Sequence, residues 1–152
     1  MKKRYLLIIS IIILFGTYTF FSQKEQKQSA NERFQQCLSE ANASFAVDYT
    51  IFDEEDKISY YMNAASNLHT AMYILPFTSY ANVKNSNQDL VNALSRLYLS
   101  ITVHATPQST NRLRTFTEKE KDIYRCLHYI SVNPKDKINC RALTKIAEDI
   151  GY

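Results

Sequence analysis

The feature that most constrains this chain is an apolar stretch near its N-terminus. Lys2, Lys3 and Arg4 precede residues 5–22, which carry no formal charge, and residues 5–21 are predominantly apolar. As a helix, these 17 residues would span about 25 Å at ~1.5 Å per residue, close to the ~30 Å hydrocarbon core of a bilayer. We therefore expect a membrane-targeting segment that can just cross a bilayer through residues 5–21.

Residues 1–22 have two interpretations, an uncleaved signal anchor and a cleaved signal peptide. A cleavage site requires small residues one and three positions before the cut. Cuts after Gly16, Ser22 or Ala30 would each put a large residue at the position that must be small (Leu14, Phe20 and Gln28). The lack of a good cleavage site favours the anchor. Because the positive charges precede the apolar run, the N-terminus is expected in the cytoplasm and the rest of the chain outside it. After cleavage the protein would instead be secreted or periplasmic.

The net charge excludes one class of partner. The chain has 18 Lys and Arg against 15 Asp and Glu, and residues 1–22 hold three of the basic residues and none of the acidic ones. The exported part is therefore neutral and lacks the basic excess of a nucleic-acid-binding protein. Its charge is uneven, because residues 23–56 carry a net −5 and residues 57–152 a net +5. Such asymmetry favours an oriented protein partner.

Glycine usage predicts the fold class. The only glycines are Gly16 and Gly151. Phosphate-binding loops, dinucleotide fingerprints and nucleophile elbows need glycine, as do tight hairpins, so these sites and a sheet are not expected. We predict an all-α protein in three parts: a signal anchor or signal peptide at residues 1–22, a polar spacer at residues 23–29, and an exported domain at residues 30–152. The exported domain is expected to be a compact bundle of about five helices.

Capping patterns and prolines predict where the helices begin and end. Two capping boxes, Ser29-Ala-Asn-Glu32 and Thr117-Glu-Lys-Glu120, predict helix starts at Ser29 and Thr117. Further helices are expected from Asp53 to Pro76, from Ser86 to before Pro107, and from Pro134 to Gly151. The predicted apolar stripes are Phe34, Cys37, Leu38, Ala41 and Phe45; Ile58, Tyr61, Met62, Ala65, Leu68, Met72 and Leu75; Leu90, Ala93, Leu94, Leu97, Tyr98 and Ile101; Ile123, Cys126, Leu127 and Ile130; and Cys140, Leu143, Ala147 and Ile150.

All three cysteines lie on these stripes. Cys126 is seven residues before Asn133 and Cys140 seven after it, so the two would meet in an antiparallel hairpin. Outside the cytoplasm such a pair is expected to form a disulfide. A bridge from Cys37 to one of the two, or three free thiols, are the alternatives.

Catalytic, cofactor and metal sites are not expected. His69, His104 and His128 are isolated from one another along the chain. Cys126 and His128 are two residues apart, which would point them to different sides of a helix. The sequence names no reaction.

The best candidates for a partner-binding site begin the second expected helix: Asp53, Glu54, Glu55, Asp56 and Tyr60. The stripe containing Tyr61 leaves Tyr60 for the outer face, and exposed tyrosines are frequent anchors in interfaces. The sequence thus predicts a small membrane-anchored or exported protein that binds another envelope protein, as an inhibitor, immunity-type protein or accessory subunit. An envelope hydrolase with an acidic-residue site and a purely structural anchor remain the alternatives.

Overall fold

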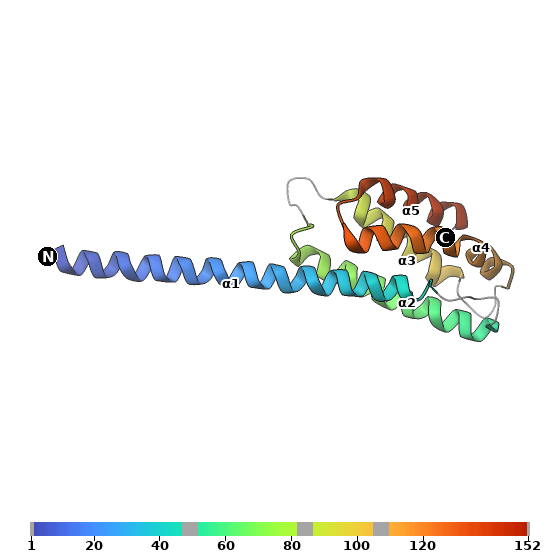
Figure 1. The fold of residues 1–152 in the computed structure, drawn as a ribbon, viewed down its shortest axis with the longest axis horizontal. Helices are drawn as coiled ribbons and strands as arrows, with labels where there is room; N and C mark the ends of the chain where they lie inside the picture. The colour runs from blue at the N-terminus through green and yellow to red at the C-terminus, as the bar shows by residue number, and fades with distance from the viewer. Residues whose placement is uncertain (1, 47–51, 82–86, 105–109, 152) are drawn as a thin grey trace.

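The longest element is one continuous helix, α1 (Lys2–Ala43), of 42 residues. Its N-terminal part, residues 2–30, projects from the molecule as a stalk, and the rest packs within a helical bundle (Figure 1). This computed structural model describes residues 2–46, 52–81, 87–104 and 110–151, without the side chains of residues 2–13, 54, 104 and 110–115.

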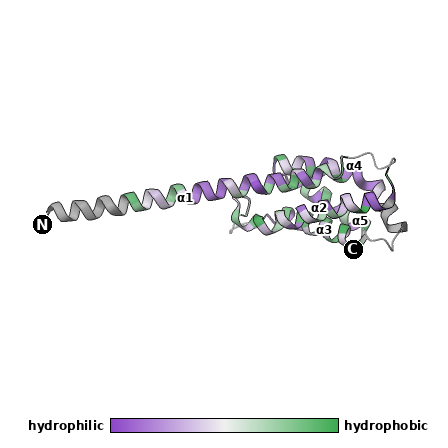
Figure 2. Cartoon of the chain, turned by 90° about the horizontal axis from the view of Figure 1, so that it is seen from below, coloured by the Kyte–Doolittle hydropathy of each residue, from purple (hydrophilic) through white to green (hydrophobic). Residues whose placement is uncertain are grey.

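The expected helix start at Ser29 is wrong, because α1 passes through residues 23–29 without a break. The physical reason is that the predicted spacer consists mainly of glutamine, lysine and glutamate, which all favour helix. Glu32 does not cap an N-terminus; its carboxylate accepts a hydrogen bond from Gln28 at 3.0 Å. The stalk and the first bundle helix are therefore one rod. Figure 2 shows this rod changing from apolar to hydrophilic ahead of the bundle.

Among the helices that the structure describes, none is both long and apolar enough to cross a membrane. The side chains of residues 2–13, which include the first half of the expected segment at residues 5–21, lie outside that description.

The remaining elements are α2 (Glu54–Ile74), the short 3₁₀ helix η2 (Leu75–Phe77), α3 (Gln88–His104), α4 (Thr110–Val132) and α5 (Lys137–Ile150). The described ranges contain helices and no strands, so the expected all-helical bundle is confirmed. Around the bundle, neighbouring helices follow the closed order α1, α2, α3, α5, α4 and back to α1. Both α2 and α4 run back toward the stalk, whereas α3 and α5 run away from it (Figure 1).

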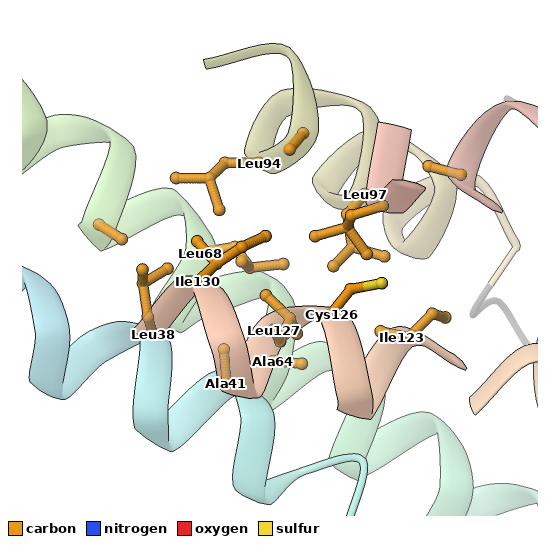
Figure 3. Close-up of a cluster of buried hydrophobic side chains, with 14 of the residues drawn as sticks. Leu38, Ala41, Ala64, Leu68, Leu94, Leu97, Ile123, Cys126, Leu127 and Ile130 are labelled. Carbon is orange, nitrogen blue, oxygen red and sulfur yellow. The ribbon is translucent and has the colours of Figure 1, made fainter. Parts of the chain in front are cut away.

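The apolar stripes meet inside this ring and form one core (Figure 3). Leu38, Leu68 and Leu127 are completely buried, as their stripes predict. The prediction for Met62 is wrong, since 47% of its surface is exposed. Ala64 and Ala71 are buried instead, because α2 turns its small side chains toward neighbouring helices.

The expected start of α4 at Thr117 is also wrong, because the helix begins at Thr110. Phe116 is 1% exposed and extends the apolar stripe of α4 by two turns toward its N-terminus. Thr117 does not cap a helix; its hydroxyl lies 3.3 Å from the hydroxyl of Tyr61. Burial of the Phe116 ring thus outweighs the local capping pattern.

Candidate functional site

The acidic segment opens α2 at the end of the bundle opposite the stalk, which we call the distal end (residues 43–46, 52–61, 116–120 and 147–151; Figure 1). The side chain of Asp53 accepts a hydrogen bond at 2.9 Å from the amide of Asp56 and so caps the helix. Carboxylates in this first turn also meet the positive end of the helix dipole. Asp53, Glu55 and Asp56 are exposed, and the side chain of Glu54 lies outside the described residues.

Tyr60 and Tyr61 follow the acidic segment in very different surroundings. Tyr61 is completely buried, as its stripe predicts. Tyr60 is half-buried, packs against the edge of the core and meets the ring of Phe52 edge to face at 5.5 Å. The expectation that Tyr60 stands on the outer face is therefore met only in part. Met62 lies within the next half-turn and offers more exposed apolar surface than the sequence predicts.

Beneath the acidic segment lies a cluster of three buried aromatic rings. The ring centroid of Tyr61 is 4.7 Å from that of Phe116 and 6.0 Å from that of Phe45, and Phe45 and Phe116 are 6.0 Å apart. Such packed rings contribute free energy beyond the apolar area they bury. They join the ends of α1, α2 and α4 into a firm base for the exposed carboxylates.

Glu120 is buried at this base. The capping pattern Thr117-Glu-Lys-Glu120 predicts it instead at the exposed start of a helix. Glu120 accepts a hydrogen bond from the hydroxyl of Tyr61. Burial raises the pKa of its carboxyl to about 7, against the opposing effects of the Tyr61 hydrogen bond and the nearby charge of Lys57. The signal for its burial was in the sequence: Glu120 is four residues after Phe116 and three before Ile123, on one helical face.

The three cysteines are free thiols in the structure, and all are buried. The predicted bridge between Cys126 and Cys140 is therefore absent, although α4 and α5 form the expected antiparallel hairpin. Burial raises the pKa of Cys126, and it raises that of Cys140 to about 12. Since the thiolate is the reactive form, both groups are poorly reactive.

Across the described ranges, no three or more His, Cys, Asp or Glu side chains gather where they could hold a metal ion. The imidazole of His69 lies 5.6 Å from the ring of Tyr98, and that of His128 lies 6.2 Å from the ring of Tyr124. Both histidines thus pack on tyrosines of the surface.

Comparison with protein-family models finds no match, and neither do comparisons with curated proteins and with solved structures. The fold and the site define the class only by shape: a small helical bundle on a long helical stalk, with an acidic distal end. Its function has to be argued from its own residues.

Proposed function

We propose that this chain is a membrane-anchored or exported protein whose bundle lies outside the cytoplasm and binds another protein of the cell envelope. The observation that carries the proposal is the position of the acidic segment. Asp53, Glu55 and Asp56 are exposed at the end of the bundle opposite the stalk, on a base of packed rings. Carboxylates on such a rigid base suit a partner with a basic surface, because complementary charge speeds association and selects partners.

The contact area beside the carboxylates comes from Tyr60, one helical turn after Asp56. Met62, two turns after Glu55, adds exposed area on a different side of α2. Tyrosine contributes large amphipathic area at small entropic cost, and methionine adapts to irregular surfaces. Because Tyr60 also packs on the core, Tyr60→Ala should weaken binding by ~1–2 kcal/mol and lower stability as well. Met62→Ala, at an exposed site, should affect binding with little loss of stability.

The proposed location depends on Lys2, Lys3 and Arg4 ahead of the apolar residues 5–21. A phosphatase that folds only outside the cytoplasm should be active when fused after Tyr152. Resistance of the chain to carbonate extraction would distinguish the anchor from a cleaved signal peptide. An inactive phosphatase together with a fluorescent cytoplasmic reporter would contradict the proposed topology.

The binding proposal is tested by cross-linking and affinity purification from the envelope with three forms of the full chain. The first is the natural sequence, the second Glu55→Lys with Asp56→Lys, and the third Arg125→Glu with Lys145→Glu, which changes the same amount of charge at exposed sites outside the distal end. We expect a partner that is recovered with the first and third forms and lost with the second. Equal recovery with all three would exclude the distal end as the binding site.

A hydrolase is the second candidate, and the raised pKa of Glu120 is the observation in its favour, since a neutral carboxyl can act as a general acid. Glu120 is only 8% exposed, however, and its carboxyl is occupied by the Tyr61 hydroxyl. A substrate would have to displace packed rings to reach it. We therefore assign Glu120 to the stability of the distal end.

The third candidate is a purely structural anchor. Such a protein would recover no partner in the affinity purification.

A further inference from the structure

Two segments, residues 75–81 and 131–138, lie beside α1 where the stalk leaves the bundle (Figure 1). We call them together the collar. Asn31 of α1 is bonded twice to Ser79: its side-chain amide donates to the serine hydroxyl at 3.0 Å, and its oxygen accepts from the Ser79 amide at 2.8 Å. One turn further along α1, the Gln35 side chain donates to the carbonyl of Ser131 at 3.2 Å. The collar is thus the part of the bundle nearest to residues 2–30 (Figure 1).

The surface of the collar combines apolar and basic side chains. Phe77, Val132 and Ile138 are 64%, 68% and 81% exposed. Lys135 and Lys137 are exposed between the last two. Large exposed apolar groups mark a contact surface, and the exposed lysines that lie between Val132 and Ile138 in the chain give the sign of what is contacted. Asp136, which caps α5 through Ile138 and Asn139, is one carboxylate against these two lysines, so residues 131–138 keep a net positive charge.

A hollow of ≈ 450 Å³ lies where the stalk meets the collar. Its lining includes Phe20, Lys24, Lys27 and Asn31, which recur at helical spacing on one face of α1, and Ser79 of the collar. The bonds between Asn31 and Ser79 hold this face toward the collar. The lining contains no carboxylate, and neither lysine forms an ion pair within the described chain. The hollow therefore offers two cations and an aromatic ring.

Length places the collar close to a bilayer. With residues 5–21 in the membrane, Ser22 marks the edge of the hydrocarbon, and the nine residues to Asn31 rise about 14 Å at ~1.5 Å per residue. Headgroups occupy about 5–8 Å of this distance. The distance that remains between headgroups and collar is about one Debye length at physiological salt, ~8 Å. The charge of the bilayer surface is therefore only partly screened at the lysines of the collar. A tilt of ~20°, the average for membrane helices, brings one side of the collar closer.

We propose that the collar rests on the surface of the bilayer that holds the stalk and binds anionic lipid headgroups there. Lys24 and Lys27 bind phosphate groups in the hollow, with Phe20 beside the acyl chains. Lys135 and Lys137 attract neighbouring headgroups across the remaining distance, and the exposed Phe77 and Ile138 belong to the part of the bundle nearest the interfacial layer. Because the distal end is the end of the bundle opposite the stalk, the candidate binding site faces away from the membrane (Figure 1). This inference rests on the proposed anchor.

The test uses the full chain in nanodiscs of phosphatidylcholine, with or without phosphatidylglycerol, and measures lysine acylation by mass spectrometry. We expect Lys24, Lys27, Lys135 and Lys137 to react severalfold more slowly in the anionic discs. The exposed Lys121 and Lys145 serve as internal controls and should react equally in both. High salt should remove the difference, and inorganic phosphate added to the neutral discs should not reproduce it.

A pair of variants makes the test specific. Lys24→Glu with Lys27→Glu should restore the reactivity of Lys135 and Lys137 in anionic discs, and Lys121→Glu with Lys145→Glu should leave their protection unchanged. Equal reactivity in both disc types, for a chain that resists carbonate extraction, would overturn the lipid site and leave the anchor intact. A chain that does not enter discs would overturn both. Protection of the collar only in discs that hold two copies would assign it to self-association and also overturn the lipid site.

Discussion

The two ends of the bundle handle apolar side chains in opposite ways. At the distal end the large rings of Phe45, Tyr61 and Phe116 are at most 4% exposed, and carboxylates cover the surface. At the collar Phe77 and Ile138 are more than 60% exposed, and Ile138 follows the exposed Lys137. Exposing apolar surface to water is unfavourable. The two ends of the bundle are therefore suited to different surroundings.

The distal end has the composition of a surface that stays in water until a partner arrives. Its carboxylates are exposed, and its large rings, Phe45, Tyr61 and Phe116, are buried and stabilise the fold. The collar has the composition of a surface that is seldom fully hydrated. Four predictions examine this contrast, beginning with the distal core, where the largest effects are expected.

Removing a ring from the distal core should be the most damaging single change. Tyr61→Ala leaves a cavity beside Phe116 and removes the hydroxyl that Glu120 accepts from, so the free energy of unfolding should fall by ~3–5 kcal/mol. Tyr60→Ala, at a half-buried position, should cost no more than ~2 kcal/mol. Chemical denaturation of both variants measures the difference. Equal losses would mean that the base of the distal end is not the buried cluster described above.

The pH dependence of stability should reveal Glu120. The pKa of its carboxyl is raised from 4.5 to about 7, so the folded state holds this proton more tightly than the unfolded chain does. The stabilisation from Glu120 is therefore fully present below pH 4.5 and is lost as the pH rises to about 7. The shift corresponds to about 3 kcal/mol across this window.

Glu120→Gln keeps a neutral side chain at every pH and should flatten this part of the stability profile. Glu55→Gln, an exposed carboxylate at the same end, is the matched control and should keep the natural slope. Unfolding curves at pH 5 and pH 7.5 provide the measurement. A slope that survives in Glu120→Gln would show that another group carries the proton.

What the sequence could and could not predict differs between the two ends for a physical reason. The stripes of α1, α3 and α5 follow from helical periodicity, and Leu38, Leu97 and Leu143 are buried as predicted. The starts of α1 and α4 were missed, because capping boxes are local patterns and both sites lie inside longer helices. The burial of Phe116 and Glu120 depends on α2, which is distant in sequence.

The candidate site shows the same limit. Helix-dipole reasoning correctly placed Asp53 at the start of α2, where it caps the helix. The outward orientation of Tyr60 was only partly right, since the neighbouring Phe52 holds its ring against the core edge. The collar could not be found from sequence, because its two segments, residues 75–81 and 131–138, lie beside Asn31 and Gln35 of α1 only in the folded chain.

The helix caps at the two ends allow a smaller comparison. Asp136 at the collar accepts from the amides of Ile138 and Asn139 and from the Asn139 side chain, at 3.0, 3.1 and 2.8 Å. Asp53 accepts from one amide. Asp136→Ala should therefore cost ~1–2 kcal/mol and Asp53→Ala ~0.5–1 kcal/mol, with Asp→Asn at each site as the milder control. Urea midpoints measure both, and the reverse order would contradict the assignment of these bonds.

The Asp136 cap should also respond to acid. Hydrogen bonds from the Asn139 side chain and backbone lower the pKa of the Asp136 carboxyl from its ordinary 3.8. Its contribution to stability is therefore present above pH 3.8 and is lost as the pH falls through the lowered value. The two ends should thus respond to pH in opposite directions, since Glu120 stabilises most in acid.

The smallest expected effect is at the collar, and it decides whether the contrast between the ends is real. Ile138 is 81% exposed, so Ile138→Ser should change the free energy of unfolding by less than ~0.5 kcal/mol. Ile150 on the same helix is 7% exposed, and Ile150→Ser should cost several times more. Thermal unfolding of the two variants in detergent, away from a lipid surface, gives this comparison. If Ile138→Ser is as damaging as Ile150→Ser, Ile138 stabilises the fold, and its exposure offers no support for contact with a membrane. If the change is silent in detergent but lowers protection of Lys135 and Lys137 in anionic nanodiscs, the isoleucine stabilises contact with the bilayer and contributes nothing to folding.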